Sequence, residues 1–269
     1  MVWVVGGLGA LALVALAWGW FEAGWVRLRT IDVPVDGLRT DLDGVRVAHL
    51  SDFHLGAPSR GTRAVERSVA WVEERRPDIV AITGDLLTHP RGERRLRELI
   101  ARLPRCYAVL GNHDFGDARD PLAKPSRLDE LAPARLLRDD SESIDVRNRR
   151  VQIVGVDPTA YRRGTSRPEE RVDHEADLRI LLCHFPRVFD RLEQGAFDLV
   201  LAGHLHDGQI AIPYGRDKLR LAHLSGRYAK GIFRRGASVM HVSPGLGTTF
   251  VPFRFFARPE ATELVLRAR

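Results

Sequence analysis

The sequence is poor in the residues that build disulfide frameworks and cysteine-ligated metal sites. It contains only two cysteines among 269 residues. Both of them, Cys106 and Cys183, lie in apolar runs that predict buried strands. A disulfide framework and a cysteine-ligated zinc site are therefore excluded. We expect two reduced thiols in the core.

The sequence also lacks a strong excess of charge of one sign. Lys and Arg number 41 against 35 for Asp and Glu, and Arg supplies nearly all of the positive charge along the whole chain. The net charge of +6 suits an anionic substrate or a membrane surface. No stripe of alternating basic and aromatic residues is evident, so nucleic acid is not an expected partner.

Long apolar runs are absent except at the amino terminus, where residues 2–21 carry no charge. At about 1.5 Å per residue such a helix is long enough to cross a bilayer. Trp18, Trp20 and Trp25 would then lie at one membrane interface. A cleaved signal peptide is the alternative, but a basic leading segment is missing and the run is longer than usual. We expect a retained, single-pass anchor in a bacterial-type inner membrane.

The charges beside this run suggest its orientation and the domain limits. Arg27 and Arg29 follow it, so the positive-inside rule places the domain that follows in the cytoplasm. The expected organisation is an anchor over 1–26, a polar linker with a first strand over 27–44, and a catalytic domain over 45–269. Composition of 44% hydrophobic and 28% charged residues is that of a globular protein.

Strand and helix patterns alternate in the first half of the chain. Strands are predicted over 45–50, 78–83 and 106–110, and helices over 63–75 and 93–102. In the second half, we predict a helix over 128–137, a long loop over 157–177 and strands over 149–156, 179–183 and 198–202. Residues 237–242 and 262–266 are expected to form strands of a second sheet. The alternation indicates an α/β layered fold with a largely parallel sheet at its start.

Acidic and histidine side chains follow five of these strands. They are Asp52, His54, Asp85, Asn112, His113, Asp114, His184, His204 and His206. The carboxyl ends of strands in open α/β sheets are where ligands bind, so these residues can converge from distant parts of the chain. Oxygen and imidazole donors without thiolates suit Mn²⁺, Fe or Zn²⁺ rather than Ca²⁺. The sequence therefore predicts a metal site.

The number of donors fits two divalent metal ions with one bridging carboxylate. We expect Asp85 to be the bridge, because it is a lone Asp after a Gly at the end of a buried strand. One residue separates Asp52 from His54, and one separates His204 from His206. In an extended strand, side chains two positions apart lie on the same face, so both members of each pair would point to the same side. Two such cations clamp a phosphoryl group and activate a water molecule. His113 is then free to transfer a proton or stabilise charge, and Asp114 to orient its imidazole.

Five blocks of the sequence, in order, resemble the signatures of the calcineurin-like metallophosphoesterases. The blocks are Ser51 to Gly56, Gly84-Asp85, Gly111 to Asp114, His184 and Gly203 to His206. The resemblance implies a four-layer α/β/β/α sandwich with two mixed sheets. It implies one metal held by Asp52, His54, Asp85 and His206, another held by Asp85, Asn112, His184 and His204, and His113 as the catalytic histidine.

Within that family, the amino-terminal run and two further segments resemble the membrane-associated YaeI/YkuE-like phosphodiesterase subgroup. The segments are Gly208-Gln209 and the stretch from Ser243 to Gly247 with Pro252 to Phe255. Related members include UDP-2,3-diacylglucosamine diphosphatases. Leu205 and Asp207 depart from the family pattern, and Asp207 is expected to add negative charge near the site.

The function predicted from these features is hydrolysis of a phosphodiester or pyrophosphate bond, in a phosphorylated small molecule or a lipid-linked substrate of the UDP-diacylglucosamine type. Two alternatives stay open. One is a nuclease or nucleotide phosphodiesterase of the same fold, suggested by the basic balance. The other is a non-catalytic, metal-binding membrane scaffold, although none of the predicted ligand positions is degenerate.

Overall fold

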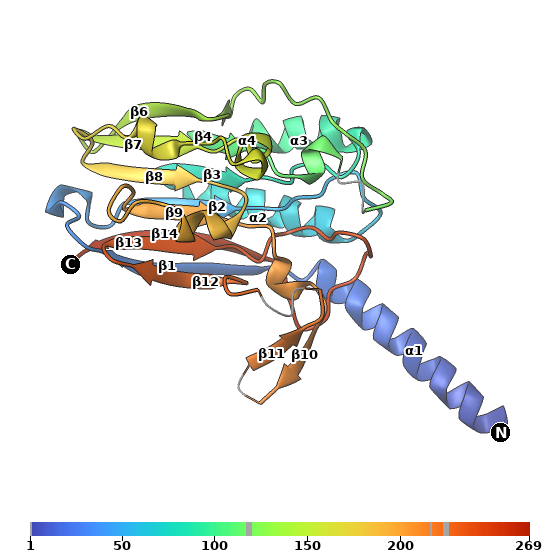
Figure 1. The fold of residues 1–269 in the computed structure, drawn as a ribbon. Helices are drawn as coiled ribbons and strands as arrows, with labels where there is room; N and C mark the ends of the chain where they lie inside the picture. Colours follow the sequence, from blue (N-terminus) through green and yellow to red (C-terminus); the bar gives the residue numbers. More distant parts are fainter. Residues whose placement is uncertain (1, 117–119, 216, 223–225) are drawn as a thin grey trace.

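Two six-stranded sheets stacked face to face form the body of the protein, in a computed structural model that describes residues 2–116, 120–215, 217–222 and 226–269 (Figure 1). In spatial order the first sheet contains β1 (Arg27–Val35), β14 (Glu260–Ala268), β2 (Arg46–Leu50), β3 (Ile79–Thr83), β4 (Cys106–Val109) and β5 (Arg135–Leu136). The second contains β12 (Gly231–Arg235), β13 (Ser238–Val242), β9 (Leu199–Ala202), β8 (Leu178–Leu182), β7 (Arg149–Gly155) and β6 (Asp140–Val146). Both sheets are mixed: β2 to β5 run parallel, as do β13, β9, β8 and β7, while β14 runs antiparallel to β2.

The apolar runs of the sequence explain this layering. The central strands are buried along their whole length, as expected for strands covered on both faces. One apolar core lies between the two sheets, and another joins the first sheet to α2 (Gly61–Arg75) and α3 (Glu93–Ile100). A third core covers the outer face of the second sheet with α4 (Pro158–Arg163) and a short turn over Pro186–Asp190.

Most of the predicted elements are confirmed. The helices expected over 63–75 and 93–102 are α2 and α3, and the strands expected over 149–156, 179–183 and 198–202 are β7, β8 and β9. The segment 237–242 contains β13 of the second sheet, as predicted. Cys106 and Cys183 are buried and unpaired, and burial raises the pKa of the Cys183 thiol to about 12.

Three predictions are wrong. Residues 128–137 contain no α-helix; this segment turns and then forms β5. Pro133 has no backbone N–H to donate to a helix, and its ring disfavours helical backbone angles at the residue before it. The expected loop over 157–177 contains α4 and a 3-10 turn over Pro168–Arg171. Residues 262–266 belong to β14 of the first sheet, where β1 pairs with β14 along all nine residues.

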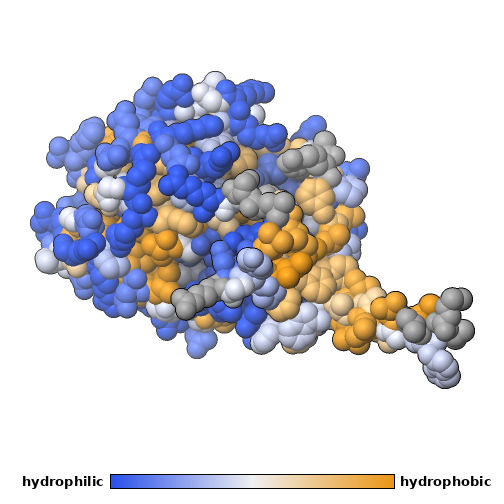
Figure 2. Space-filling view, turned by 60° about the horizontal axis from the view of Figure 1, so that its bottom comes forward, coloured by the Kyte–Doolittle hydropathy of each residue, from blue (hydrophilic) through white to orange (hydrophobic). Residues whose placement is uncertain are grey.

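Two elements project from the body on the same side (Figure 1). One is α1 (Val2–Ala23), of which Val5–Ala23 is long and apolar enough to cross a membrane. The other is a separate two-stranded sheet of β10 (Ala211–Tyr214) and β11 (Asp217–Arg220). In the space-filling view, apolar surface extends from α1 onto the body beside it (Figure 2).

Candidate metal centre

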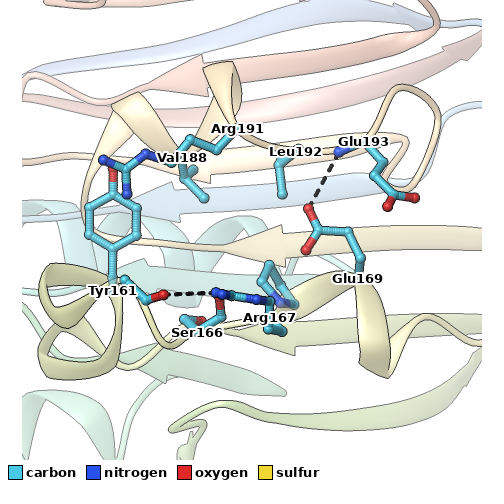
Figure 3. Close-up of a pocket in the computed structure, with 10 residues that line it drawn as sticks. Tyr161, Ser166, Arg167, Glu169, Val188, Arg191, Leu192 and Glu193 are labelled. Carbon is cyan, nitrogen blue, oxygen red and sulfur yellow. Dashed lines mark hydrogen bonds between the residues drawn. The ribbon is translucent and has the colours of Figure 1, made fainter.

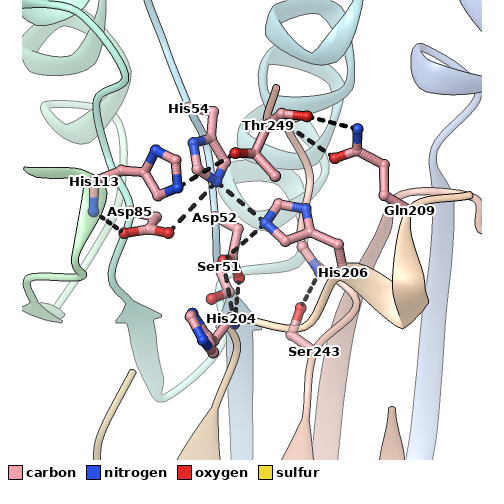
Figure 4. Close-up of polar contacts among 12 residues, drawn as sticks. Ser51, Asp52, His54, Asp85, His113, His204, His206, Gln209, Ser243 and Thr249 are labelled. Atoms are coloured by element: carbon pink, nitrogen blue, oxygen red, sulfur yellow. Dashed lines mark hydrogen bonds and ion pairs between the residues drawn. The ribbon is translucent and has the colours of Figure 1, made fainter. Parts of the chain in front are cut away.

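The predicted ligands gather where the carboxyl ends of five strands meet. They follow β2, β3 and β4 of the first sheet and β8 and β9 of the second. Because the strands within each of these two sets are parallel, their carboxyl ends lie at a common edge. Residues up to 154 positions apart in the sequence, Asp52 to His206, therefore surround one point (Figure 4).

Four of these residues form a first buried group. Asp52, His54, Asp85 and His206 each offer a ligand atom within 4.8 Å of the others. Nε2 of His54 lies 3.2 Å from Nε2 of His206 and 3.5 Å from Oδ2 of Asp85. Two buried ring nitrogens that face each other beside a carboxylate present lone pairs to a shared point, which suits a cation.

A second group shares Asp85 with the first. It contains Asp85, His184 and His204, again with ligand atoms within 4.8 Å of one another. Oδ1 of Asn112 lies 3.1 Å from Nε2 of His184, and so does Nδ1 of His204. These are the two ligand sets that the family resemblance implies.

Burial and the mutual charges of the donors shift their pKa values. Burial, with a smaller effect of charge on His184, lowers the pKa of His204 to about 3, so this imidazole is neutral at pH 7 and keeps one nitrogen lone pair free to bind a metal. Burial would also lower the pKa of His184, but the charge and hydrogen bond of Asp85 raise it to about 9. Burial opposes ionisation of Asp85, yet the charges of His184 and His113 hold its pKa well below the ordinary value.

The backbone around the donors is strained. Asp52, His54, Asp85, His204 and His206 all have φ between +47° and +79°, in the left-handed region that side chains other than glycine seldom adopt. The expectation that Asp52 with His54, and His204 with His206, share a face of an extended segment is therefore wrong. The side chains of Asp52 and His54 converge because β2 ends at Leu50 and the chain then turns.

Two glycines of the sequence blocks are needed for close approach. A Cβ on Gly111 would lie 2.1 Å from Oδ1 of Asp85, and one on Gly203 would lie 2.0 Å from Oγ of Ser51 and 2.4 Å from Oδ2 of Asp52. Since real Cβ atoms do not come so close to oxygen, any larger residue would displace the carboxylates.

His113 lies beside the two groups with partners that the sequence did not reveal. Its amide donates to Oδ1 of Asp85 at 2.8 Å, and its ring packs edge-on against His54. Nε2 lies 3.3 Å from Oγ1 of Thr249, and Nδ1 lies 3.5 Å from Oδ2 of Asp120. Thr249 in turn donates to Asp120 at 3.0 Å.

Asp114, which we predicted to orient this imidazole, has a different position. Its carboxylate accepts hydrogen bonds from the amides of Leu86, Leu87 and Gly111. Burial and the charge of Asp85 raise its pKa to about 7. Asp114 therefore ties the turn after β4 to the turn after β3, and Asp120 is the carboxylate nearer to the His113 ring. No sequence motif distinguishes Asp120.

The calcineurin-like phosphoesterase family matches residues 45–208, more than half of the chain and all nine predicted site residues. The chain belongs to this family. It is therefore a metal-dependent phosphoesterase, with a site that can hold two divalent ions.

The similar proteins include membrane-associated members. Metallophosphoesterase YkuE of Bacillus subtilis is 25% identical over 98% of this chain and 96% of its own length. A "Transmembrane protein with metallophosphoesterase domain" of Danio rerio is 32% identical over 88% of this chain, which covers 56% of that protein. Metallophosphoesterase YkoQ of B. subtilis is 28% identical over 87% of this chain and 90% of its own length. Together with α1, the name of the Danio rerio protein favours membrane anchoring of this phosphoesterase.

A buried arginine supports the first group of ligands in this phosphoesterase. The guanidinium of Arg254 is fully buried and donates to the carbonyls of Gly247, Pro244 and Ala257. It also lies 3.1 Å from Nδ1 of His206. Burial lowers the pKa of Arg254 to about 10, so it stays charged at neutral pH. The segment Pro252 to Phe255 carried the resemblance to the subgroup, and its arginine fixes the ring of His206.

Asp207, the departure from the family pattern, does not contribute a free negative charge. Its carboxylate accepts from Nζ of Lys218 at 2.7 Å and from Nε of Arg220 at 3.0 Å. Both cations belong to β11, so Asp207 holds the small β10–β11 sheet against the turn that carries His206.

Three cavities adjoin the donors. One of about 560 Å³ is mostly apolar and reaches from His206 to Leu221, Phe250 and Val251. Two others carry arginines: Arg187 and Arg227 beside His204, and Arg162 and Arg163 beside Asn112. A further cavity of about 350 Å³ lies over the second sheet and is lined by ten residues, none of them a predicted ligand (Figure 3).

Proposed function

We propose that this protein is a dinuclear, metal-dependent phosphohydrolase that cleaves a phosphodiester or pyrophosphate bond in a lipid-linked substrate. The observation that carries the metal part is the sharing of Asp85 between two buried groups of donors. Asp52, His54, Asp85 and His206 would hold one ion, and Asp85, Asn112, His184 and His204 the other. Mn²⁺, Fe and Zn²⁺ all suit this donor set.

When bound, such a pair of ions binds the phosphoryl oxygens, activates water and stabilises the charge of an in-line displacement. The remaining work falls to the protein. His113 lies next to the shared carboxylate and is in position to donate a proton to the leaving oxygen. Oγ1 of Thr249 lies within hydrogen-bond distance of its Nε2, and the carboxylate of Asp120 lies 3.5 Å from its Nδ1.

The cavities around the centre support the substrate class. The apolar cavity beside His206 suits a hydrocarbon chain, whereas the arginines beside His204 and Asn112 suit a second anionic group. A substrate with a phosphoryl group between an apolar and an anionic part, such as a UDP-diacylglucosamine-type molecule, fits both sides at once.

The cellular placement is part of the same proposal. α1 would cross a bacterial-type inner membrane once, with the catalytic domain in the cytoplasm because Arg27 and Arg29 follow the helix. Such an arrangement keeps the centre next to lipid-linked substrates at all times.

The metal part is tested with Asp85→Asn and His113→Ala in the full-length protein, assayed on bis-p-nitrophenyl phosphate with added Mn²⁺. Both variants should lose more than about 100-fold in kcat/KM, since even changes behind metal ligands cost 10–100-fold. Only Asp85→Asn should also lose bound metal. Asp129→Asn and His174→Ala change exposed residues of the same types and serve as controls. Full activity of Asp85→Asn would overturn the mechanism.

The substrate part needs a separate screen of nucleotide-diphosphate lipids, soluble nucleotides and DNA. Preference for lipids is expected. Cleavage of DNA with a steep salt dependence would instead favour a nuclease. Failure on every phosphoester by a metal-loaded preparation would favour a non-catalytic scaffold.

A further inference from the structure

The two projecting elements differ in how they cover their apolar residues. α1 exposes its side chains around the whole helix over most of its length, as a membrane span does. The sheet of β10 and β11 has only two strands and is too small to have a core of its own. Its apolar side chains are therefore exposed on one face: Ile212 by 51%, Tyr214 by 80% and Leu219 by 47%. We propose that the outer face of this small sheet, together with Phe250 and Val251, docks onto the surface of the same bilayer that α1 enters.

The first step of the argument is that α1 is fixed to the body rather than flexibly linked. The amide of Arg254 donates to the carbonyl of Gly19 at 3.0 Å, and the amide of Ala257 donates to Oε1 of Glu22 at 2.8 Å. The ring of Phe255 packs on Gly19, where a Cβ would approach it to 2.5 Å. The segment 250–257 therefore lies against the last turns of α1.

The second step is the length of α1. Its 22 residues span about 33 Å, little more than the roughly 30 Å of a bilayer core. Nearly the whole helix is therefore needed to cross, so its last turns lie at the membrane interface. Trp18 and Trp20, which are partly exposed there, are residues typical of that level. The segment 250–257 must lie at the same depth, because it contacts these turns.

The third step is the alternation of side chains in the small sheet. Ile212 pairs with Leu219, so both project to one face, and Tyr214 follows two residues after Ile212 on that face. Lys218 and Arg220 project to the other face, where they bind Asp207. The ion pairs thus fix the inner face to the body and leave the other face uncovered; it carries these apolar residues and, at its tip, Asp217 opposite Tyr214.

The fourth step is that this face joins the metal centre. The cavity of about 560 Å³ that begins at His206 ends at Leu221, Phe250 and Val251, whose side chains are themselves partly exposed. A docked bilayer would close the open side of this cavity. A lipid could then enter it without passing through water.

The surroundings favour a bilayer as the occupant over a second copy of the chain. A groove between α1 and the small sheet is lined by Trp25, Arg27 and Arg258 as well as by Glu22 and Asp217, and the guanidinium of Arg258 stacks on Trp25 at 3.6 Å. Aromatic and cationic residues beside an apolar face match the interface of a membrane that contains anionic lipids. Phe250 and Val251 belong to the segment that packs against α1, which a bilayer must cover in any case.

The test measures the depth of fluorophores in the full-length protein, reconstituted in nanodiscs of phosphatidylcholine and phosphatidylglycerol. Leu219→Cys and Phe250→Cys are labelled with an environment-sensitive dye, and Arg94→Cys on α3, distant from α1, is the control. The native thiols are buried. Doxyl lipids should quench the first two labels at least about threefold more than the control. Labels at 219 and 250 that behave like the control would overturn the proposal, as would labels shielded from water but not quenched by lipid, which would indicate a second copy.

A second variant separates docking from folding. Ile212→Asp with Leu219→Asp should reduce quenching of the Phe250→Cys label to the level of the control, while hydrolysis of soluble bis-p-nitrophenyl phosphate stays within about twofold. Unchanged quenching would overturn the proposal. The depth of a label does not depend on catalysis, so this result stands apart from the test of Asp85→Asn.

Discussion

The metal centre and the side of the molecule around α1 reverse the usual distribution of polar and apolar residues. At the centre, carboxylates and imidazoles such as Asp52, Asp85 and His184 are buried. Around α1, large apolar side chains such as Tyr214 and Phe256 are exposed. Each reversal costs free energy in an isolated, metal-free protein in water.

The difference between the two regions indicates what each requires from outside the chain. Buried donors are stabilised by cations that neutralise them, and exposed apolar residues are stabilised by a bilayer that covers them. The turn of His206 and Asp207 joins the two regions, since one residue faces the metal site and the other holds β11. Changes that affect only one region can therefore be compared with changes at this junction.

The largest effect is expected from crowding the centre. Gly203→Ala places a Cβ 2.0 Å from Oγ of Ser51, so the carboxylate of Asp52 must move. Activity should fall more than about 100-fold and stability by about 1–3 kcal/mol, the range of an overpacked site. Gly9→Ala in α1 meets no atom within 4 Å and should change neither. Metal content and thermal unfolding measure the result, and an active Gly203→Ala protein would contradict the geometry.

A smaller effect is expected at the junction, from Arg254→Lys. An ammonium cannot reach the three carbonyls and the His206 ring that the guanidinium contacts. Metal affinity should fall about 10–100-fold, as for other partners of metal ligands. Isothermal titration calorimetry with Mn²⁺ measures this affinity. Arg94→Lys is the exposed control, and equal affinity of both variants would show that Arg254 has no role in positioning His206.

The third effect depends on pH. The pKa of His184 is about 9 in the metal-free protein, above its ordinary value of 6.5, so the protonated form prevails below pH 9. A metal ligand must lose this proton, and affinity should therefore rise about tenfold per pH unit between pH 7 and 9 and level off above. The same shift means that the metal-free protein gains stability from His184 below pH 6.5 and loses it as pH rises through 9. A metal affinity that does not change between pH 7 and 9 would show that a proton on His184 does not compete with the metal ion.

The smallest effect is expected on the apolar side. Ile212→Ser should change the free energy of unfolding in detergent by less than about 0.5 kcal/mol, because the side chain is half exposed. Leu264→Ala in β14, which is fully buried, should cost about 2–5 kcal/mol. Chemical denaturation of both variants tests the contrast. A large cost of Ile212→Ser would mean that this face is packed within the protein.

The sequence predicted the strands of the centre and the helices α2 and α3 correctly, and three other segments wrongly. Continuous apolar runs such as those of β3 and β9 predict buried strands by themselves, because each is covered on both faces. The prediction of a helix over 128–137 was wrong because the buried leucines of this segment lie in a turn around Pro133 and not on one face of a helix. The sheet to which β14 belongs was missed because strand order depends on contacts across the whole chain.

The sequence alone determined the family, the layered α/β fold, the residues that gather at the candidate metal centre and the apolar amino-terminal helix, because each is encoded in local residue types and spacing. Only the tertiary structure decided that Asp120 rather than Asp114 lies beside the His113 ring, and that Arg254 links His206 to the segment beside α1. These relations join residues far apart in the chain. Local pattern carries no information about them, since distances between strand ends are set by the packing of the two sheets.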